Sequence, residues 1–300
     1  MHIGIAGAGK MGSAIARRLL GLGHPVAVWN RTPAGARAVV EAGATLARTP
    51  KDLAQAVEVV ISILTNAEAI EAVFGGDAGL LAADLEGKLI IEMSTVRPHT
   101  QRELGPRAAA AGAIYVECPV GGTVGPALEG KLFGFVGGAD ADVARARPVL
   151  ELLCRRVEHV GALGAGATMK LAINLPLMVY WQALSEALSL AQPLGLDPQR
   201  VIDIFSDTSG AATMLKGRGP RIAQALAGAP AGPATVDVAT MCKDLRNMLD
   251  EGAAQGRDLP AAASALAVFQ RAAASGLGSA DGVQLPEWWI REGGRRTPRP

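Results

Sequence analysis

The sequence predicts an α/β protein in two parts, with a parallel sheet flanked by helices in the first part and helices alone in the second. Three observations support this. Short apolar runs alternate with amphipathic helical patterns up to about residue 161. A glycine cluster joins the first apolar run to the first helical pattern. Beyond residue 161 no strand-like run appears, while signals for helix starts follow one another.

The strands are expected where four to eight mainly apolar residues stand between turn residues. These runs are residues 3–6, 25–29, 57–64, 88–93, 113–117, 132–136 and 156–160. After the first run, Met11, Ile15 and Leu19 recur at helical spacing with Arg17 and Arg18 on the other side, which predicts a helix packed on the sheet. Further helices are expected to begin with a proline in the first turn, at Pro50, Pro98, Pro198 and Pro260.

These elements divide the chain into three predicted regions. Residues 1–162 are expected to form an α/β domain, and residues 163–292 an all-helical domain. Residues 293–300 hold three arginines, two prolines and two glycines, which predicts a frayed tail.

Composition narrows the class of function. With 29 basic and 28 acidic residues the net charge is +1, which argues against a nucleic-acid or membrane-surface partner and favours a small molecule. The three cysteines form no CxxC pair and the four histidines are scattered, so neither a disulfide framework nor a metal site is expected. The first residues show no signal-peptide pattern, and we expect a cytoplasmic protein.

The strongest local motif is Gly7-Ala8-Gly9-Lys10-Met11-Gly12, a GxGxxG placed between a strand and a helix. In such a turn the first glycine permits the tight bend, the second lets the backbone approach a pyrophosphate, and the third lets helix and strand pack closely. The helix N-terminus adds N–H donors for the anion. The motif therefore predicts a Rossmann-type domain that binds NAD(P).

The end of the second strand indicates which cofactor is preferred. NAD enzymes usually carry Asp or Glu there for the ribose 2′-hydroxyl, but this chain reads Asn30-Arg31-Thr32. An arginine suits a 2′-phosphate, so we expect NADP(H) to be preferred over NAD(H). The alternative is that Arg31 is an ordinary solvated loop charge.

Lys170 is the only charged residue between positions 161 and 184. If this segment is helical, Asn174 lies four residues later on the same face, so an ammonium and an amide project together from an otherwise apolar helix. Burial lowers the pKa of a lysine toward neutrality, where a proton donor works best. The alternative is a lysine whose stem crosses a core helix and whose ammonium reaches the surface.

Four motifs taken together carry a resemblance. They are the glycine turn, Met93-Ser94-Thr95-Val96 with Pro98, Glu117-Cys118-Pro119-Val120-Gly121-Gly122-Thr123, and Gly164-Ala165-Gly166 leading to Lys170 and Asn174. A fifth, Lys243-Asp244-Leu245, lies near the end. From residue 3 to about residue 290 the chain resembles the β-hydroxyacid dehydrogenases, a family that includes 3-hydroxyisobutyrate dehydrogenase, tartronate semialdehyde reductase and glyoxylate/succinic semialdehyde reductase.

The resemblance implies a role for each matched position. Lys170 would give and take the proton at the substrate oxygen, and Asn174 would orient the substrate. Thr95 and Lys243 would lie along the cofactor. The turn Leu64-Thr65-Asn66 would also touch the nucleotide. The fold it implies is a Rossmann domain joined by a long helix to a helical domain that commonly takes part in oligomerisation, so a homo-oligomer, dimer or tetramer, is expected.

The sequence departs from the family at the substrate loop. The family usually reads Asp-Ala-Pro-Val-Ser-Gly-Gly, whose serine hydroxyl and glycine amides bind the substrate carboxylate, whereas here the serine position is Gly121 and the last glycine is Thr123. Gly122 is kept. The family's first asparagine after the lysine is replaced by Ile173. Because Lys170 and Asn174 are kept, we expect an active dehydrogenase. Because the serine hydroxyl is missing, we expect a preference for substrates bulkier than glyoxylate, unless the Thr123 hydroxyl takes over the contact with the carboxylate.

Two alternatives to a hydroxy-acid or semialdehyde reaction follow from the same scaffold. One is imine reduction, in which the family's lysine is typically replaced; the presence of Lys170 counts against it. The other is a cofactor-binding sensor or reader without turnover. A measured hydride transfer would separate these possibilities.

Overall fold

The structure is a computed structural model that describes residues 1–230 and 232–294. It contains two compact units, the first spanning Met1–Leu171 and the second beginning at Ala172. The boundary lies inside one helix, α8 (Ala165–Ala191). Most of the predicted tail, residues 295–300, lies outside the described residues.

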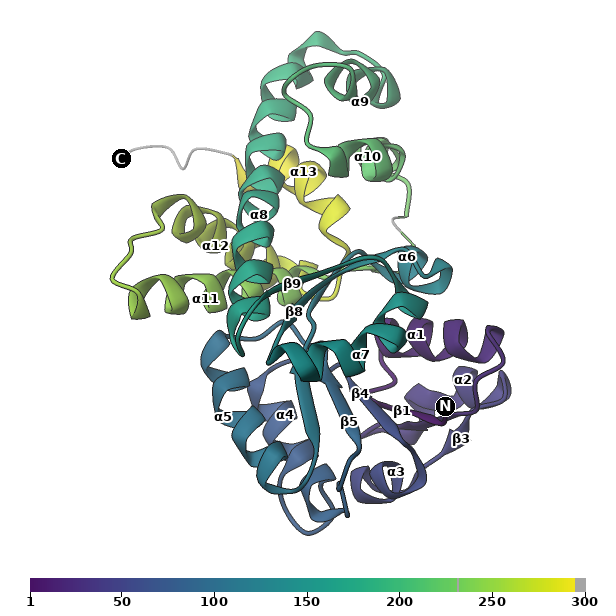
Figure 1. Ribbon diagram of the computed structural model, residues 1–300. Coiled ribbons are helices and arrows are strands. Elements are labelled where there is room, and N and C mark those ends of the chain that lie inside the picture. The colour runs from purple at the N-terminus through teal and green to yellow at the C-terminus, as the bar shows by residue number, and fades with distance from the viewer. Residues whose placement is uncertain (231, 295–300) are drawn as a thin grey trace. The chain divides into compact units, whose positions relative to one another are not determined.

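The first unit is built on a sheet in which strands far apart in sequence lie side by side (Figure 1). The order is β3-β2-β1-β4-β5-β6-β8-β7, with β9 beside β8. In this order the strands from β3 to β6 are all parallel to their neighbours. In the register of β1, Ile3 pairs with Val26 of β2 on one side and with Val59 of β4 on the other. Their bounds are β1 (Ile3–Ala6), β2 (Val26–Trp29), β3 (Thr45–Leu46), β4 (Val59–Ser62), β5 (Leu89–Glu92), β6 (Ile114–Glu117), β7 (Val120–Gly121), β8 (Leu132–Gly137) and β9 (Cys154–Gly161).

Helices cover both faces of this sheet (Figure 1). Successive residues of a strand point to opposite faces, so Val60 and Ile61 of β4 enter two different apolar clusters. One cluster contains residues of α1 (Lys10–Gly21), α2 (Arg37–Glu41), α6 (Val124–Glu129) and α7 (Asp140–Leu153). The other contains residues of α3 (Pro50–Ala56), α4 (Ala67–Phe74) and α5 (Pro98–Ala110). The predicted doubly covered Rossmann-type sheet is confirmed.

The observed sheet differs from the prediction at its far end. There β8 runs antiparallel to β6 and β7, so the sheet is mixed. The reason is local, because α6 is only six residues long and is followed by Gly130, whose φ of 70° reverses the chain. A connection this short cannot cross a sheet face, and the chain returns beside the strand that it has just left.

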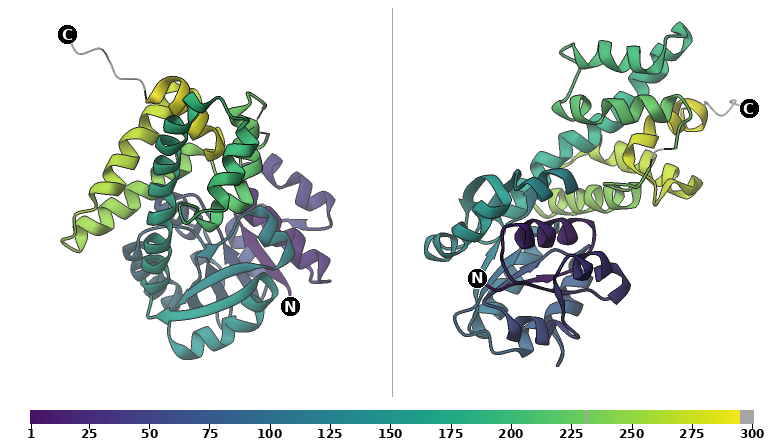
Figure 2. Two further views of the ribbon diagram at one scale, coloured as in Figure 1. Left: turned by 90° about the horizontal axis from the view of Figure 1, so that it is seen from above. Right: turned by 90° about the vertical axis from the view of Figure 1, so that its right-hand side faces the viewer.

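The described part of the second unit contains helices and connecting loops, and its extended pairing is one isolated bridge between Asp237 and Asp281. Figure 2 shows this green-to-yellow part of the chain as coils and loops. The helix starts predicted at Pro198 and Pro260 are confirmed. After α8 come α9 (Pro198–Ser206), α10 (Thr213–Leu226), α11 (Val238–Ala254), α12 (Pro260–Ala272) and α13 (Leu285–Trp288). Within the described ranges, no helix combines the length and apolarity needed to cross a bilayer.

Candidate active site

The glycine turn after β1 is as tight as the motif requires. Gly7 has a φ of 106°, and a Cβ built on Gly12 would lie 2.0 Å from the Gly7 carbonyl oxygen. Gly9 is exposed and precedes α1, whose first turn has no side-chain cap and no acidic residue. The N–H groups and positive dipole end of α1 are therefore not neutralised by the helix's own side chains. This arrangement fits the pyrophosphate of a dinucleotide.

Two further turns lie beside the glycine turn at the carboxyl edge of the sheet. A Cβ on Gly7 would come within 2.4 Å of the Ile63 carbonyl oxygen, so the turn after β4 is in direct contact with it. The Leu64 N–H in turn donates to Ser94 Oγ at 2.8 Å, which ties in the turn that carries Thr95 after β5. The contact lies where β1 neighbours both β2 and β4, the crossover point at which open α/β sheets bind ligands.

The three side chains of the turn after β4 differ in burial and in the hydrogen bonds that they make. Asn66 Oδ1 accepts from the Ala69 N–H at 2.9 Å and so caps α4. Thr65 is exposed, and Leu64 is half-buried. The sequence predicted that all three touch the nucleotide. In the structure the amide oxygen of Asn66 accepts from the Ala69 N–H and, at 3.4 Å, from the Thr65 hydroxyl, so both polar side chains already have hydrogen bonds within the turn.

The turn after β2 holds a cation and no acid. Asn30 Nδ2 donates to the Thr32 carbonyl oxygen at 2.8 Å and fixes the bend. Arg31 and Thr32 are exposed, and residues 30–36 contain neither Asp nor Glu. Thr32 precedes a short 3₁₀ helix without capping it. The Thr32 hydroxyl makes no capping hydrogen bond to the helix and lies next to an exposed arginine in the sequence. Both side chains can donate hydrogen bonds to a phosphate monoester.

A buried carboxylate is hydrogen-bonded to the turn after β5. Glu92, fully buried at the end of β5, accepts from Ser94 Oγ and, at 2.6 Å, from Gln101 Nε2. Tyr115 donates its hydroxyl to Gln101 Oε1 at 2.5 Å. Burial raises the pKa of Glu92. Because Ser94 also holds Leu64, this network fixes the turn after β4 relative to the turn after β5.

The predicted lysine and asparagine occur together on α8. Lys170 and Asn174 are each 8% exposed, whereas Met169 and Ile173, one residue earlier in each turn, are each 39% exposed. The i, i+4 spacing therefore places the ammonium and the amide on one buried face of the helix, as the sequence predicted.

Sequence reasoning gave Glu117, at the end of β6, no function of its own. Its carboxylate is buried and accepts from three backbone N–H groups at the start of α8, those of Gly164, Gly166 and Ala167. Burial raises the pKa of Glu117 to about 7, against the lowering effect of these hydrogen bonds. A glutamate that closes an otherwise apolar strand could have been noticed in the sequence. Its partners could not, because they lie 47 to 50 residues away.

The glycine-rich loop after β6 is built around β7. Gly122 has a φ of 122°, which favours glycine, whereas a Cβ on Gly121 would make only ordinary contacts, the nearest at 3.6 Å to Phe133. Phe133 and Phe135 stack beside it with ring centroids 4.7 Å apart. Thr123 precedes α6 without capping it. The loop thus combines backbone amides and a hydroxyl with an aromatic neighbour.

The remaining predicted cofactor residue, Lys243, belongs to the second unit. It lies on α11, and its ammonium is 2.8 Å from Asp244 Oδ1.

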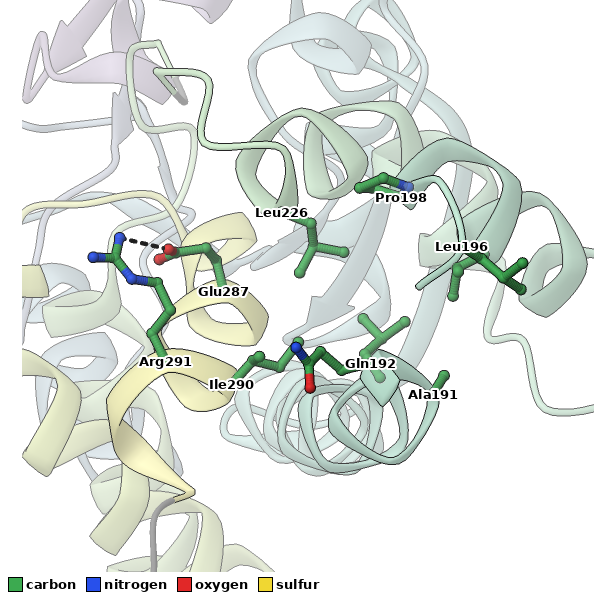
Figure 3. A pocket seen from close by; sticks show the side chains of 10 residues that line it. Ala191, Gln192, Leu196, Pro198, Leu226, Glu287, Ile290 and Arg291 are labelled. Atoms are coloured by element: carbon green, nitrogen blue, oxygen red, sulfur yellow. Dashed lines mark hydrogen bonds and ion pairs between the residues drawn. The ribbon is translucent and has the colours of Figure 1, made fainter. Parts of the chain in front are cut away.

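A pocket of about 280 Å³ lies within the second unit, between the end of α8, α9, α10 and α13 (Figure 3). It is mainly apolar, apart from Gln192 and an ion pair between Glu287 and Arg291. None of the residues predicted to bind cofactor or substrate lines it. In the part of the chain that the structure describes, no cluster of three or more metal-ligating side chains occurs.

Comparison with known proteins decides the family. Residues 2–161 match the family described as the NAD binding domain of 6-phosphogluconate dehydrogenase. Residues 164–289 match the family described as NAD-binding of NADP-dependent 3-hydroxyisobutyrate dehydrogenase. The chain belongs to the β-hydroxyacid dehydrogenase family. It is an NAD(P)-dependent oxidoreductase that acts on CH–OH groups.

Individual relatives cover most of the chain. A 3-hydroxyisobutyrate dehydrogenase of Pseudomonas aeruginosa is 38% identical over 208 residues, 69% of this chain and 70% of its own. Glyoxylate/succinic semialdehyde reductase 1 of Arabidopsis thaliana is 32% identical over 94% of this chain and 96% of its own. The solved structure of Psf3 in complex with NADP+ and 2-OPP is 30% identical, with a TM-score of 0.86 over 94% of this chain and 98% of its own.

Imine reductases are more distant from this β-hydroxyacid dehydrogenase. The enzyme of Myxococcus stipitatus is 21% identical, with a TM-score of 0.63 over 95% of this chain and 98% of its own. That likeness shows a shared fold and nothing further.

Proposed function

We propose that this protein transfers hydride between NADP(H) and a hydroxy acid or semialdehyde-like carbonyl compound, with Lys170 as the general acid and base. The observation that carries the proposal is the pairing of Lys170 with Asn174 on one buried face of α8. A buried ammonium next to an amide can donate to a carbonyl oxygen and hold it in place.

The cofactor would be held at the carboxyl edge of the sheet. The pyrophosphate turn would consist of Gly7, Ala8, Gly9, Lys10, Met11 and Gly12, and the ribose would be reached by Asn30, Arg31 and Thr32. The turns after β4 and β5 would add Leu64, Thr65, Asn66 and Thr95. The family resemblance adds Lys243, which belongs to the second unit. The exposed arginine and the absence of Asp or Glu from residues 30–36 favour NADP(H) over NAD(H).

In the reductive direction, Asn174 orients the substrate and Lys170 faces its carbonyl oxygen. When bound, the nicotinamide supplies the hydride to the carbonyl carbon. As negative charge develops on the oxygen, the Lys170 ammonium donates a proton to it and becomes a neutral amine, which solvent reprotonates. In oxidation the neutral amine accepts the hydroxyl proton of the substrate.

The loop of Gly121, Gly122 and Thr123 would bind the far end of the substrate. Its amides and the Thr123 hydroxyl suit a carboxylate, and Thr123 is not used to cap α6. The space left by the absent side chain at Gly121 and the stacked Phe133 and Phe135 favour a substrate with more apolar bulk than glyoxylate.

The test is a single-turnover measurement of hydride transfer from NADPH, monitored by loss of its absorbance, with semialdehydes and larger carbonyl compounds. Lys170→Ala should lower the rate by about 10²- to 10⁴-fold, with the NADPH dissociation constant unchanged. Lys170→Arg should not restore the rate, because guanidinium holds its proton. Met169→Ala, a truncation of an exposed side chain in the same helical turn, is the matched control and should keep the rate. Normal transfer by Lys170→Ala would reject the assignment.

We also propose that the second unit takes part in a homo-oligomer. The family resemblance supports this, and light scattering after size-exclusion chromatography tests it, because a monomer mass would reject it.

A further inference from the structure

We propose that Glu117 is a positioning residue for proton transfer, because its carboxylate fixes the first turn of α8 and thereby the place of Lys170. The inference rests on the proposed function of Lys170. It also rests on the contacts of Glu117, which that function does not use.

The first support is the number and direction of the contacts. Glu117 Oε1 accepts from the Gly164 N–H at 2.5 Å and from the Gly166 N–H at 3.0 Å, and Oε2 accepts from the Ala167 N–H at 3.1 Å. The first turn of an α-helix has N–H groups without partners inside the helix, and here one side chain from β6 takes three of them. A carboxylate also interacts favourably with the positive end of the helix dipole.

The second support is that the backbone leaves a space shaped for this carboxylate. Gly137 on β8 pairs with Glu117, and a Cβ there would lie 2.2 Å from Glu117 Oε1. A Cβ on Gly166 would lie 3.2 Å from the carboxylate carbon and 2.4 Å from the Phe135 carbonyl oxygen. A larger residue at either glycine would therefore push the carboxylate or the helix away. The start of α8 is held against β6 and β8 at van der Waals distance.

The third support is the short path from these contacts to Lys170. Ala167 precedes Lys170 by three residues, less than one helical turn, and both belong to the first compact unit. A helix segment of this length is stiff, so a shift or rotation of its first turn moves the lysine with it. A displacement of about 1 Å at a reacting group can cost about 100-fold in rate.

Glu117 also contributes charge. Burial raises its pKa to about 7, so it passes from acid to carboxylate near neutral pH. The carboxylate form binds the three N–H groups more strongly and favours the ammonium form of a nearby lysine. Glu117 interacts electrostatically with Glu92, Tyr115 and Cys118. Arg102 of α5 lies beside Gly164, His159 of β9 bonds the Gly161 carbonyl oxygen, and Lys170 follows Ala167 on α8 by three residues.

The experiment is the pH profile of single-turnover hydride transfer in Glu117→Gln. Glutamine has the same size but carries an NH₂ group in place of one carboxylate oxygen. This NH₂ group is a donor, so it cannot accept a hydrogen bond from the backbone N–H group that it meets. We expect a loss of about 10- to 100-fold in rate, an alkaline limb displaced to lower pH, and an unchanged NADPH dissociation constant. Glu158→Gln, at a β9 side chain that is 43% exposed, is the matched control and should change none of these.

Combining Glu117→Gln with Lys170→Ala separates this inference from the proposed function. If Glu117 acts through Lys170, the double variant should be no slower than Lys170→Ala. Multiplied losses, or a Glu117→Gln enzyme with normal rate and normal alkaline limb, would overturn the positioning role and leave Lys170 untouched. A normal rate in Lys170→Ala would instead overturn the proposed function.

If Glu117→Gln does not fold, the unaltered protein gives the answer by amide hydrogen exchange. Protection factors of Gly164, Gly166 and Ala167 should fall about tenfold between pH 6 and pH 8, because the pKa of Glu117 is about 7 when the helix start is closed and 4.5 when it is open, so ionisation of Glu117 favours opening. Amides in the middle of α8 serve as the reference. Equal protection at both pH values would overturn the proposal.

Discussion

Alanine at two glycines of the same turn should separate folding from cofactor binding. A Cβ on Gly12 would lie 2.0 Å from the Gly7 carbonyl oxygen, and real Cβ atoms essentially never come closer than 3.0 Å to such an atom. The strand and helix must therefore separate by at least about 1 Å, because the obstacle is backbone and has no other rotamer. A Cβ on Gly9 would meet nothing within 4 Å, and its φ of −75° suits any residue.

The expected magnitudes differ accordingly. Gly12→Ala gains about 1 kcal/mol of helix propensity but must absorb an overpacking cost of about 3 kcal/mol or more, so we expect a net loss of about 2 kcal/mol in the free energy of unfolding. Gly9→Ala should leave the free energy of unfolding within about 0.5 kcal/mol. It should nevertheless raise the NADPH dissociation constant at least about tenfold, because the methyl group occupies the space that a pyrophosphate would enter.

Urea unfolding followed by tryptophan fluorescence gives the stabilities, and titration of NADPH fluorescence gives the dissociation constants. Gly21→Ala, later in α1 and with nothing within 4 Å of its Cβ, is the matched control for both. Tight NADPH binding by Gly9→Ala would refute the placement of the pyrophosphate at this turn. Full stability of Gly12→Ala would refute the packing argument.

Three other changes have defined outcomes. Arg31→Asp should reverse the order of NADPH and NADH dissociation constants, and equal constants in the unaltered protein would contradict the role of Arg31. Gly121→Ser, which the loop can accommodate, should raise kcat/KM for glyoxylate relative to bulkier carbonyl compounds; no change would remove this loop as the determinant of specificity. The raised pKa of Glu117, about 7 against 4.5, means that its stabilising contribution is complete below pH 4.5 and is lost as pH rises through 7. Urea unfolding of the unaltered protein should show this loss as a decrease of about 3 kcal/mol in the free energy of unfolding. The decrease should be smaller in Glu117→Gln, because glutamine does not titrate.

The elements that the sequence predicted well are those with local signals. The predicted strand at 3–6 coincides with β1, and the other predicted strands begin and end within two residues of the observed ones. Thr49 caps α3 through the Asp52 N–H, which is the local hydrogen bond that its position before Pro50 predicts. The two-residue strands β3 and β7 were missed, because two residues show no periodicity and their pairing depends on strands elsewhere in the chain.

The site divides in the same way. The glycine turn and the Lys170–Asn174 pair could be predicted, because each consists of residues within one turn or one helix. The contact between Ser94 and Leu64 spans 30 residues, and the contacts of Glu117 span 47 to 50. Such contacts depend on strand order, which a single sequence without long-range information does not specify. What could be read locally was the presence of two acids, Glu92 and Glu117, each closing a buried strand.

The placement of the unit boundary inside α8 determines how related enzymes can be recombined. Lys170 falls on one side of the boundary and Asn174 on the other, although they share a single face of a single helix. A chimera joined at residue 171 would take its ammonium from one parent and its amide from the other. Joining the parents in the turn at residues 162 and 163 keeps both groups from one parent, but it draws Glu117 and the N–H groups that it binds from different parents. Recombination that preserves the whole assembly must therefore transfer β6 together with α8, which a single joint placed before β6 achieves.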